Sequence, residues 1–285
     1  MTESNDSVLR SMTNDGGFRV IVASTTDTVQ EIVDAQGATG GSILQVANLM
    51  TGTILVRETM APQYRVQGIV RGAGNQGSIV VDAHPDGANR GLLSLPEGAP
   101  QIALGEGATL QIMRTLMNGQ IHQGLVSFDG VRTLSEGLMK YMQISEQVTS
   151  VIDVACLVEH ERVVAAGGYL VQLLPDVAEG MLAIMTERLH LFDPVETLLR
   201  KGKLSPRELS AELLYGMPHG EMGSSPLRFG CNCSHMRIVA SLSTLSRGEI
   251  EELYKSGETL EISCDFCGKD YHVSPDQLRG LLASN

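Results

Sequence analysis

Four of the five cysteines stand in two close pairs near the end of the chain, and this spacing constrains the fold more than any other feature. Cys231 and Cys233 form a C-x-C pair, Cys264 and Cys267 form a C-x-x-C pair, and 30 residues separate the two pairs. Two such pairs brought together supply four sulfurs for a closed tetrahedral Zn²⁺ site, and thiolates select zinc over magnesium or calcium. The spacing therefore predicts one zinc ion per chain, bound by these four cysteines in the reduced state.

The sequence around the cysteines predicts a small unit over residues 228–285. Ser246 with Glu249 is typical of a helix start and Gly257 of its end, a strand is expected at 271–273, and Ser274 precedes a last helix. So short a unit buries too little apolar surface to be stable without a cross-link. We expect the metal to hold its fold, so that removing zinc largely unfolds it.

The remaining candidate ligands have simpler interpretations. His235 and His272 lie near the pairs, but four cysteines already complete a tetrahedron, so neither histidine is predicted to bind the metal. Cys156 lies in the apolar run VIDVACLV, where a single cysteine is typical of a small buried hydrophobic residue. The alternative for the four paired cysteines is a redox role, because each pair can also close a local disulfide when its thiolates are oxidised.

Length and composition narrow the classes of function. The chain has 285 residues, of which 42% are hydrophobic and 19% charged, as expected for a folded protein with one large domain and a smaller one. With 21 basic and 33 acidic residues the net charge is −12, which repels phosphate backbones and argues against nucleic-acid binding. The start, MTESNDSVLR, does not resemble a signal peptide, and no window has 18 uncharged apolar residues, so we expect a cytoplasmic protein without membrane contact.

Residues 1–175 are predicted to form an α+β domain resembling an α/β sandwich, with a mainly antiparallel sheet. Runs of strands are interrupted by helices without regular alternation, and the loops are rich in Gly, Asn, Asp and Pro. Strands are expected at residues 18–24, 64–70, 77–81, 109–113, 119–128, 151–159 and 162–174, and helices from about 28, over 43–60 and over 134–150.

Residues 176–227 are predicted to form a helical linker. Asp193-Pro194 with Glu196 and Ser205-Pro206 with Glu208 each place a cap residue, a first-turn proline and a third-position glutamate at a helix start. The composition of residues 216–226, GMPHGEMGSSP, predicts a flexible segment. The apolar positions of this region are Val177, Met181, Ile184, Met185, Leu189, Leu198, Leu199, Leu213 and Leu214. They either pack on the domain core or form a switchable surface that binds other chains when uncovered.

Several stretches together resemble a known family, the redox-regulated holdase chaperones called heat shock protein 33. They are Cys231-Asn232-Cys233, Cys264-Asp265-Phe266-Cys267, YMQISEQ at 141–147 and AAGGYLVQLLP at 165–175, in an order that also includes FRVIVAS and YRVQGIVRG. The resemblance covers nearly the whole chain. It implies an α+β N-terminal domain over 1–175, a metastable helical linker over 176–227 and a zinc-binding, redox-sensing domain over 228–285.

The resemblance also implies how such a protein works. Family members are ATP-independent holdases, inactive when reduced and zinc-bound; when oxidised they form disulfides, release zinc, dimerise and bind unfolding proteins. By motif the metal ligands are Cys231, Cys233, Cys264 and Cys267, and disulfides are expected between Cys231 and Cys233 and between Cys264 and Cys267. The partners implied are unfolded client proteins and, after oxidation, a second copy of the chain.

Two rival functions are less well supported by the sequence. An enzyme is disfavoured because four cysteines leave a zinc ion without an open position and no common catalytic motif is present, so no catalytic residue is named. The alternative that we retain is a static zinc ribbon acting as a nucleic-acid or protein interaction module. Residues 228–285 hold six basic and eight acidic side chains, a net charge of −2, which disfavours the nucleic-acid form of this alternative.

Overall fold

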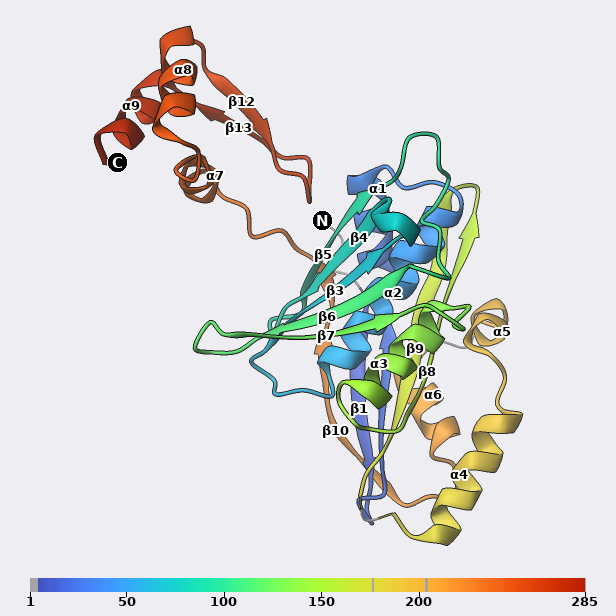
Figure 1. Cartoon of the computed structure of the whole chain (residues 1–285). Helices are drawn as coiled ribbons and strands as arrows, with labels where there is room; N and C mark the ends of the chain where they lie inside the picture. Colours follow the sequence, from blue (N-terminus) through green and yellow to red (C-terminus); the bar gives the residue numbers. More distant parts are fainter. Residues whose placement is uncertain (1–4, 176, 203–204, 285) are drawn as a thin grey trace. The chain divides into compact units, whose positions relative to one another are not determined.

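The computed structural model describes residues 5–175, 177–202 and 205–284 and is shown in Figure 1. Asp176, the first residue of the predicted linker, lies outside the described residues. The chain divides into two compact units, Met1–Gly230 and Cys231–Asn285.

Two sheets form the framework of the first unit (Figure 1). Sheet A has the strand order β10-β1-β2-β9-β8, and sheet B has the order β11-β5-β4-β3-β6-β7. All neighbours are antiparallel except the short β11 and β5, which confirms the prediction of an α+β fold with mainly antiparallel sheets. The strands are β1 Ser7–Thr13, β2 Phe18–Ser24, β3 Arg65–Arg71, β4 Ser78–Ala83, β5 Ala88–Ser94, β6 Thr109–Thr115, β7 Ile121–Ser127, β8 Ser150–Glu159, β9 Arg162–Leu173, β10 His219–Pro226 and β11 Arg228–Phe229.

Helices α1 (Thr26–Gln36) and α2 (Gly41–Arg57) form the layer between the sheets. Helix α2 packs on β8 and β9 of sheet A and on β3 and β4 of sheet B. It buries 14 of its 17 residues, which explains why its sequence is apolar around the whole circumference. The main core of the unit is therefore built around α2.

Two glycines show how closely the helices approach sheet B. Gly68 and Gly124 lie in one cross-strand row, each opposite Ile112. A Cβ atom at Gly68 would lie 2.2 Å from Thr53 Oγ1 of α2, and one at Gly124 would lie 2.7 Å from the Tyr141 ring of α3 (Leu134–Ile144). Helices α2 and α3 thus cover the same, inner face of sheet B. The predicted helix over 134–150 was too long: α3 ends at Ile144, and the positive φ of 58° at Gln147 is incompatible with a helix continuing to residue 150.

The helical segment after β9 covers the outer face of sheet A. It contains α4 (Glu179–Leu191), α5 (Val195–Arg200) and α6 (Pro206–Leu213). The sheet contributes Phe18, Val20, Val22, Tyr169 and Val171 to this second core, and the helical segment contributes Met185, Val195, Leu198, Leu199, Leu209, Leu213 and Leu214. Most of the predicted apolar positions therefore pack on the domain, but Ile184 does not, since 48% of it is exposed.

The two predicted helix starts in this segment had different outcomes. Helix α6 begins as predicted, because Ser205 Oγ accepts a hydrogen bond from the Glu208 backbone N–H. Asp193 does not cap α5; its carboxylate instead pairs with Lys201 at 2.6 Å. Asp153 of β8 takes its place and accepts a hydrogen bond from the Val195 N–H at 2.8 Å. A residue of sheet A thus holds the start of a helix that covers it.

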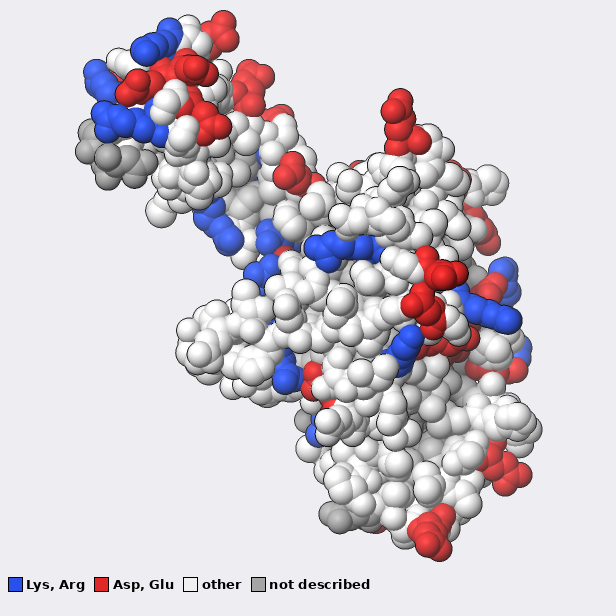
Figure 2. All heavy atoms as spheres, in the orientation of Figure 1, with Lys and Arg blue, Asp and Glu red and all other residues white. Residues whose placement is uncertain are grey.

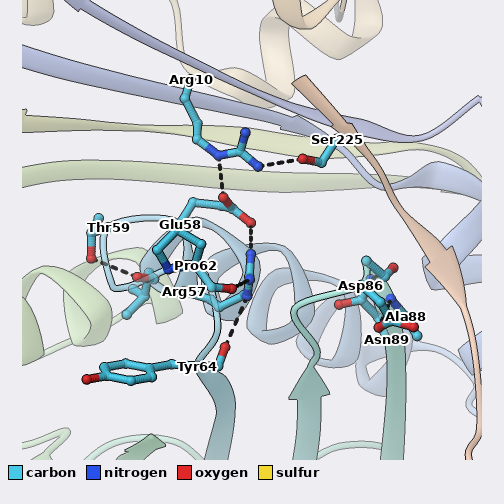
Figure 3. Close-up of polar contacts among 12 residues, drawn as sticks. Arg10, Arg57, Glu58, Thr59, Pro62, Tyr64, Asp86, Ala88, Asn89 and Ser225 are labelled. Atoms are coloured by element: carbon cyan, nitrogen blue, oxygen red, sulfur yellow. Dashed lines mark hydrogen bonds and ion pairs between the residues drawn. The ribbon is translucent and has the colours of Figure 1, made fainter. Parts of the chain in front are cut away.

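The prediction that residues 216–226 are flexible was wrong for most of that stretch. Residues 219–226 form β10, which pairs along the whole of β1. Arg10 of β1 joins this edge to the interior: its side chain donates to Ser225 at 2.7 Å and pairs with Glu58 at 2.5 Å, and Glu58 also pairs with Arg57 (Figure 3). Strand pairing uses backbone groups, which a composition rich in Gly and Ser still provides.

The second unit is small and has a thin core. It contains α7 (His235–Leu242), α8 (Arg247–Ser256), α9 (Pro275–Ser284) and the antiparallel pair β12 (Leu260–Ser263) and β13 (Asp270–Val273). Ser246 and Glu249 form the predicted capping box of α8, and Gly257 ends the helix in the left-handed conformation. Its buried hydrophobic residues within 231–282 are Ile250, Cys264, Tyr271, Val273 and Leu278.

Candidate metal centre

The second unit brings its four cysteines together from an extended segment and a turn. Cys231 and Cys233 lie in the extended segment before α7, whose first turn is capped by Ser234. Cys264 and Cys267 lie in the tight turn between β12 and β13. In this turn the Gly268 N–H donates to the Cys264 carbonyl at 2.8 Å, and Gly268 has a φ of 67° that favours glycine.

The distances between the sulfurs fit one metal ion. All four Sγ atoms lie within 4.8 Å of one another. Cys231 and Cys264 are 3.7 Å apart, and Cys233 and Cys267 are 3.4 Å apart. Tetrahedral coordination with a Zn–S distance of ~2.3 Å requires sulfurs ~3.8 Å apart, whereas a disulfide requires ~2.05 Å. None of the five cysteines, all within the described ranges, forms a disulfide, so the geometry is that of a reduced cluster that could hold a metal ion.

The electrostatics of the cluster explain why a dication suits it. Burial opposes ionisation of Cys233, but hydrogen bonds from the Tyr271 hydroxyl, at 3.0 Å, and from the neighbouring thiols lower the pKa of Cys233 to about 7. Burial, together with hydrogen bonds to the neighbouring thiols, raises the pKa of Cys267 to about 12. Burial also raises the pKa of Cys264, and the hydrogen bond with Cys231 acts in the same direction. One thiolate therefore forms easily and disfavours the next, and a bound dication would stabilise all four.

The neighbouring histidines do not join the sulfurs in the structure. His235 Nε2 lies 3.0 Å from the carbonyl oxygen of His272, and the metal-compatible cluster consists of the four cysteines. Cys156 lies on β8 of the first unit, where burial raises the pKa of its thiol to about 12. A thiol with so high a pKa is a poor nucleophile at neutral pH.

Sequence reasoning missed one residue of the centre. Tyr271 lies on β13, and its hydroxyl donates to Cys233 across the site. Its place four residues after Cys267 gave no signal, because the contact depends on the β12–β13 pairing that turns the strand back toward the first cysteine pair.

Over the described ranges 5–175, 177–202 and 205–284, no helix has the length and apolar character needed to cross a membrane.

Comparison with known proteins gives one consistent result. A family model described as "Hsp33 protein" matches residues 6–274. The 33 kDa chaperonin of Syntrophotalea carbinolica is 31% identical, with 98% of this chain and 99% of the relative covered. The 33 kDa chaperonin of Bacillus subtilis is 28% identical, with 97% and 98% covered.

A solved structure shares the fold. The crystal structure of the 33 kDa chaperonin (heat shock protein 33 homolog) from Thermotoga maritima matches with a TM-score of 0.83 over 99% of both chains, at 18% sequence identity. At that identity the match concerns the arrangement of the elements.

Proposed function

This chain belongs to the Hsp33 family of chaperones, and from that premise we propose that it is a redox-regulated, ATP-independent holdase. The observation that carries the proposal is the cysteine cluster: four thiols at metal-binding distances in a unit whose own core is thin. In the reduced state we propose that Cys231, Cys233, Cys264 and Cys267 hold one zinc ion per chain. That ion supplies a tetrahedral cross-link and keeps the sulfurs deprotonated.

The proposed switch is a two-electron oxidation within each cysteine pair. One thiolate attacks the O–O bond of a peroxide, which gives a sulfenic acid and releases hydroxide. The second thiolate of the same pair then displaces hydroxide from that sulfenic acid, and an S–S bond forms. Two peroxides therefore give the disulfides Cys231–Cys233 and Cys264–Cys267, and the cysteines release the metal because they no longer supply thiolate ligands.

The consequence would spread from the cysteines to the helical segment. We propose three functional regions: a chaperone core over 1–175, a metastable linker over 176–227 and a redox-sensing domain over 228–285. We propose that unfolding of the last region, which follows the linker directly in the chain, weakens the packing of the linker on sheet A. The apolar face of sheet A, around Val20, Val22 and Val171, would then be available to unfolding client proteins.

The remaining parts of the proposal concern partners and location. The family supports binding of unfolded proteins, and we propose that the oxidised chain forms a homodimer in the cytoplasm and that it is not an enzyme. The net charge of −12 supports a protein that does not bind nucleic acid.

The experiment is a light-scattering assay of a thermally unfolding reporter, malate dehydrogenase, with this protein either reduced and zinc-loaded or oxidised by peroxide at elevated temperature. A chromogenic chelator measures the released metal at the same time. We expect suppression of aggregation only after oxidation, with about one zinc released per chain, as a closed four-cysteine site requires. Zinc retained and aggregation unaffected in both states would favour the static zinc module.

Two serine variants test the residue assignment. Cys231→Ser and Cys264→Ser should bind less zinc and lose the oxidation-dependent switch. Cys156→Ser is the matched control, because that thiol lies outside the cluster, in sheet A. Full zinc stoichiometry in the first two variants would show that the ligand set is wrong.

A further inference from the structure

Strand β7, the last strand of sheet B, has an unusual edge. It pairs with β6 on one side and has no strand on the other among the described residues. Residues 115–127, which include β7 and the preceding turn, contain no Lys, Arg, Asp or Glu. In Figure 2 the projecting tip of this hairpin is accordingly white. Exposed edges are normally protected by charges or prolines, as on β10, where Glu221 pairs with Arg207 at 2.7 Å and Pro226 ends the strand.

The turn geometry determines which backbone groups lie at this edge. The Leu116 N–H donates to the Gln120 carbonyl at 2.9 Å, so these residues face each other across the hairpin. In an antiparallel pair such bonded positions alternate with positions whose backbone groups point outward. With the observed register, the outward positions of β7 are Ile121, Gln123, Leu125 and Ser127. The Ser127 carbonyl accepts a hydrogen bond from Lys140 Nζ at 2.8 Å, so the open part of the edge consists of the first three positions.

The side chains of these positions form an apolar surface beside the edge. They lie on the outer face of sheet B, opposite the face that Gly124 turns toward α3. Ile121 is 56% exposed and Leu125 is 59% exposed, and Met113 of β6 lies between them opposite Gln123. Met117 in the turn is 80% exposed. Free backbone donors and acceptors are thus flanked by apolar side chains, the arrangement that binds a strand by β-augmentation.

We propose that the β7 edge is a second client-binding site, which takes an extended, uncharged segment of an unfolding polypeptide as an added strand. This inference rests on the proposed holdase function and names a contact surface for it. Backbone hydrogen bonds are the same for every sequence, so this mode of binding suits a protein that must hold unrelated clients. The absence of charge along β7 favours the apolar segments that unfolding exposes.

The length of the strand argues for a polypeptide segment rather than a second copy as the occupant. Seven residues at ~3.3 Å each give an edge about 23 Å long. Two copies joined along that single strand would bury much less than the ~1,200 Å² of a stable interface. One added strand also binds weakly alone, so the reduced protein stays inactive as a holdase. After oxidation the edge and the uncovered face of sheet A would bind the same client. Binding at one site would raise the effective concentration of the client at the other and so increase the overall affinity.

The first experiment uses the reduced, zinc-loaded full-length protein and NMR-detected amide hydrogen exchange. The probe is a seven-residue peptide of alternating valine and threonine, and its control has proline in place of each threonine. We expect the first peptide alone to slow exchange at the Gln123 and Leu125 amides, with little change at Gly124, whose amide already faces β6. Equal effects of both peptides, or no protection at these amides, would overturn the proposal.

The second experiment compares two variants of one residue. Gln123→Pro removes an outward N–H without breaking the β6–β7 ladder, because proline is tolerated at a solvent-facing edge position. Gln123→Thr keeps the N–H, and both variants lose the hydrogen bond from Gln111. After oxidation we expect about five times more of the proline variant to be needed for equal suppression of aggregation, as loss of roughly one hydrogen bond implies, with the threonine variant close to wild type.

A charge variant covers the case in which Gln123→Pro misfolds. Leu125→Lys places a charge beside the edge, and Leu44→Lys, at a position 41% exposed on α2 and outside both sheets, is its control. We expect weaker holdase activity only for the first. If oxidised wild type fails to suppress aggregation, the proposed function falls, while the peptide experiment still tests the edge. If wild type suppresses it and the Gln123 and Leu125 variants match their controls, the β7 site is wrong.

Discussion

The two compact units of this chain are stabilised in different ways. In the first, α2 lies between two sheets and buries 14 of its 17 residues, so an aliphatic core holds the fold. In the second, within residues 231–282, five hydrophobic residues are buried, and one of them is Cys264. The first unit has the core of an ordinary domain, whereas the second buries few apolar side chains and includes one of its four clustered cysteines among them. A chemical change at the sulfurs should therefore unfold one unit and spare the other.

The proposed linker helices bury less apolar surface than α2 and more than the helices of the second unit. Helices α5 and α6 bury Leu198, Leu209 and Leu213 on sheet A, but α4 fully buries only Met185 and exposes Leu191 and Ile184. A single layer of side chains packs this segment against sheet A. Its packing should be the part of the first unit that is easiest to disturb.

The largest expected effect is that of removing zinc from the reduced protein. Structural zinc contributes on the order of 10 kcal/mol to such small units, so the second unit should unfold when a strong chelator is added. NMR should show loss of dispersed signals from residues 231–284, including Tyr271, while α2 signals such as that of Leu49 persist. The same pattern is expected for Cys264→Ser without chelator. Persistence of the Tyr271 signals in the metal-free protein would show that the thin core is sufficient.

Local sequence patterns predicted elements whose signals lie within a few residues. The β-branched run of β2, the two strands β8 and β9 around His160, and the capping box of Ser246 and Glu249 were all found. Strands β1, β5, β10, β11 and β12 were missed. In the first three, Arg10, Asn89 and the glycines of β10 interrupt the apolar pattern. Their pairing depends on partners elsewhere in the chain, as β1 pairs with β10 across more than two hundred residues.

More of the candidate site than of the rest of the fold could be predicted from the sequence. Thiolate spacing alone indicated the four cysteines that the structure brings together, because metal ligation requires few residue types at short intervals. Tyr271 could not be found in this way, since a tyrosine near a cysteine pair has no characteristic spacing. The cap of α5 was assigned to Asp193 and is supplied by Asp153, because the sheet offers a carboxylate that local sequence does not reveal.

A second prediction concerns the linker and has an intermediate effect. Leu213→Ala removes a fully buried side chain between α6 and sheet A and should weaken this packing by ~2–5 kcal/mol. If the linker is the weak part of the first unit, the variant should reach full holdase activity at a lower peroxide concentration, with unchanged zinc content. Leu191→Ala is the control, since the same substitution at a residue 75% exposed should change neither quantity much. If both variants needed the same peroxide concentration, the packing of the linker would not control activation.

The smallest expected effect comes from a buried carboxyl group in the first unit. Asp6 is 3% exposed, and its carboxylate accepts a hydrogen bond from the Thr28 N–H at 2.7 Å. Burial raises the pKa of Asp6 from 3.8 to about 6, against the opposing effect of the hydrogen bonds from Thr28. Because the folded state binds the proton more tightly, this group adds stability below pH 3.8 that is lost as the pH rises through 6. The whole contribution is about 3 kcal/mol, and about 1 kcal/mol of it falls between pH 5 and 7.5.

Urea unfolding of the zinc-loaded protein at pH 5 and 7.5 measures this contribution. Between pH 5 and 7.5 the free energy of unfolding should fall by ~1 kcal/mol more for wild type than for Asp6→Asn. An amide at this position keeps the hydrogen bond from Thr28 and does not ionise. Asp34→Asn, an exposed carboxylate on α1, should behave as wild type. If Asp6→Asn kept the wild-type pH dependence, the raised pKa would be wrong. If it removed the dependence, the stability of the first unit would follow proton binding in its own core, while that of the second followed its thiolates and metal.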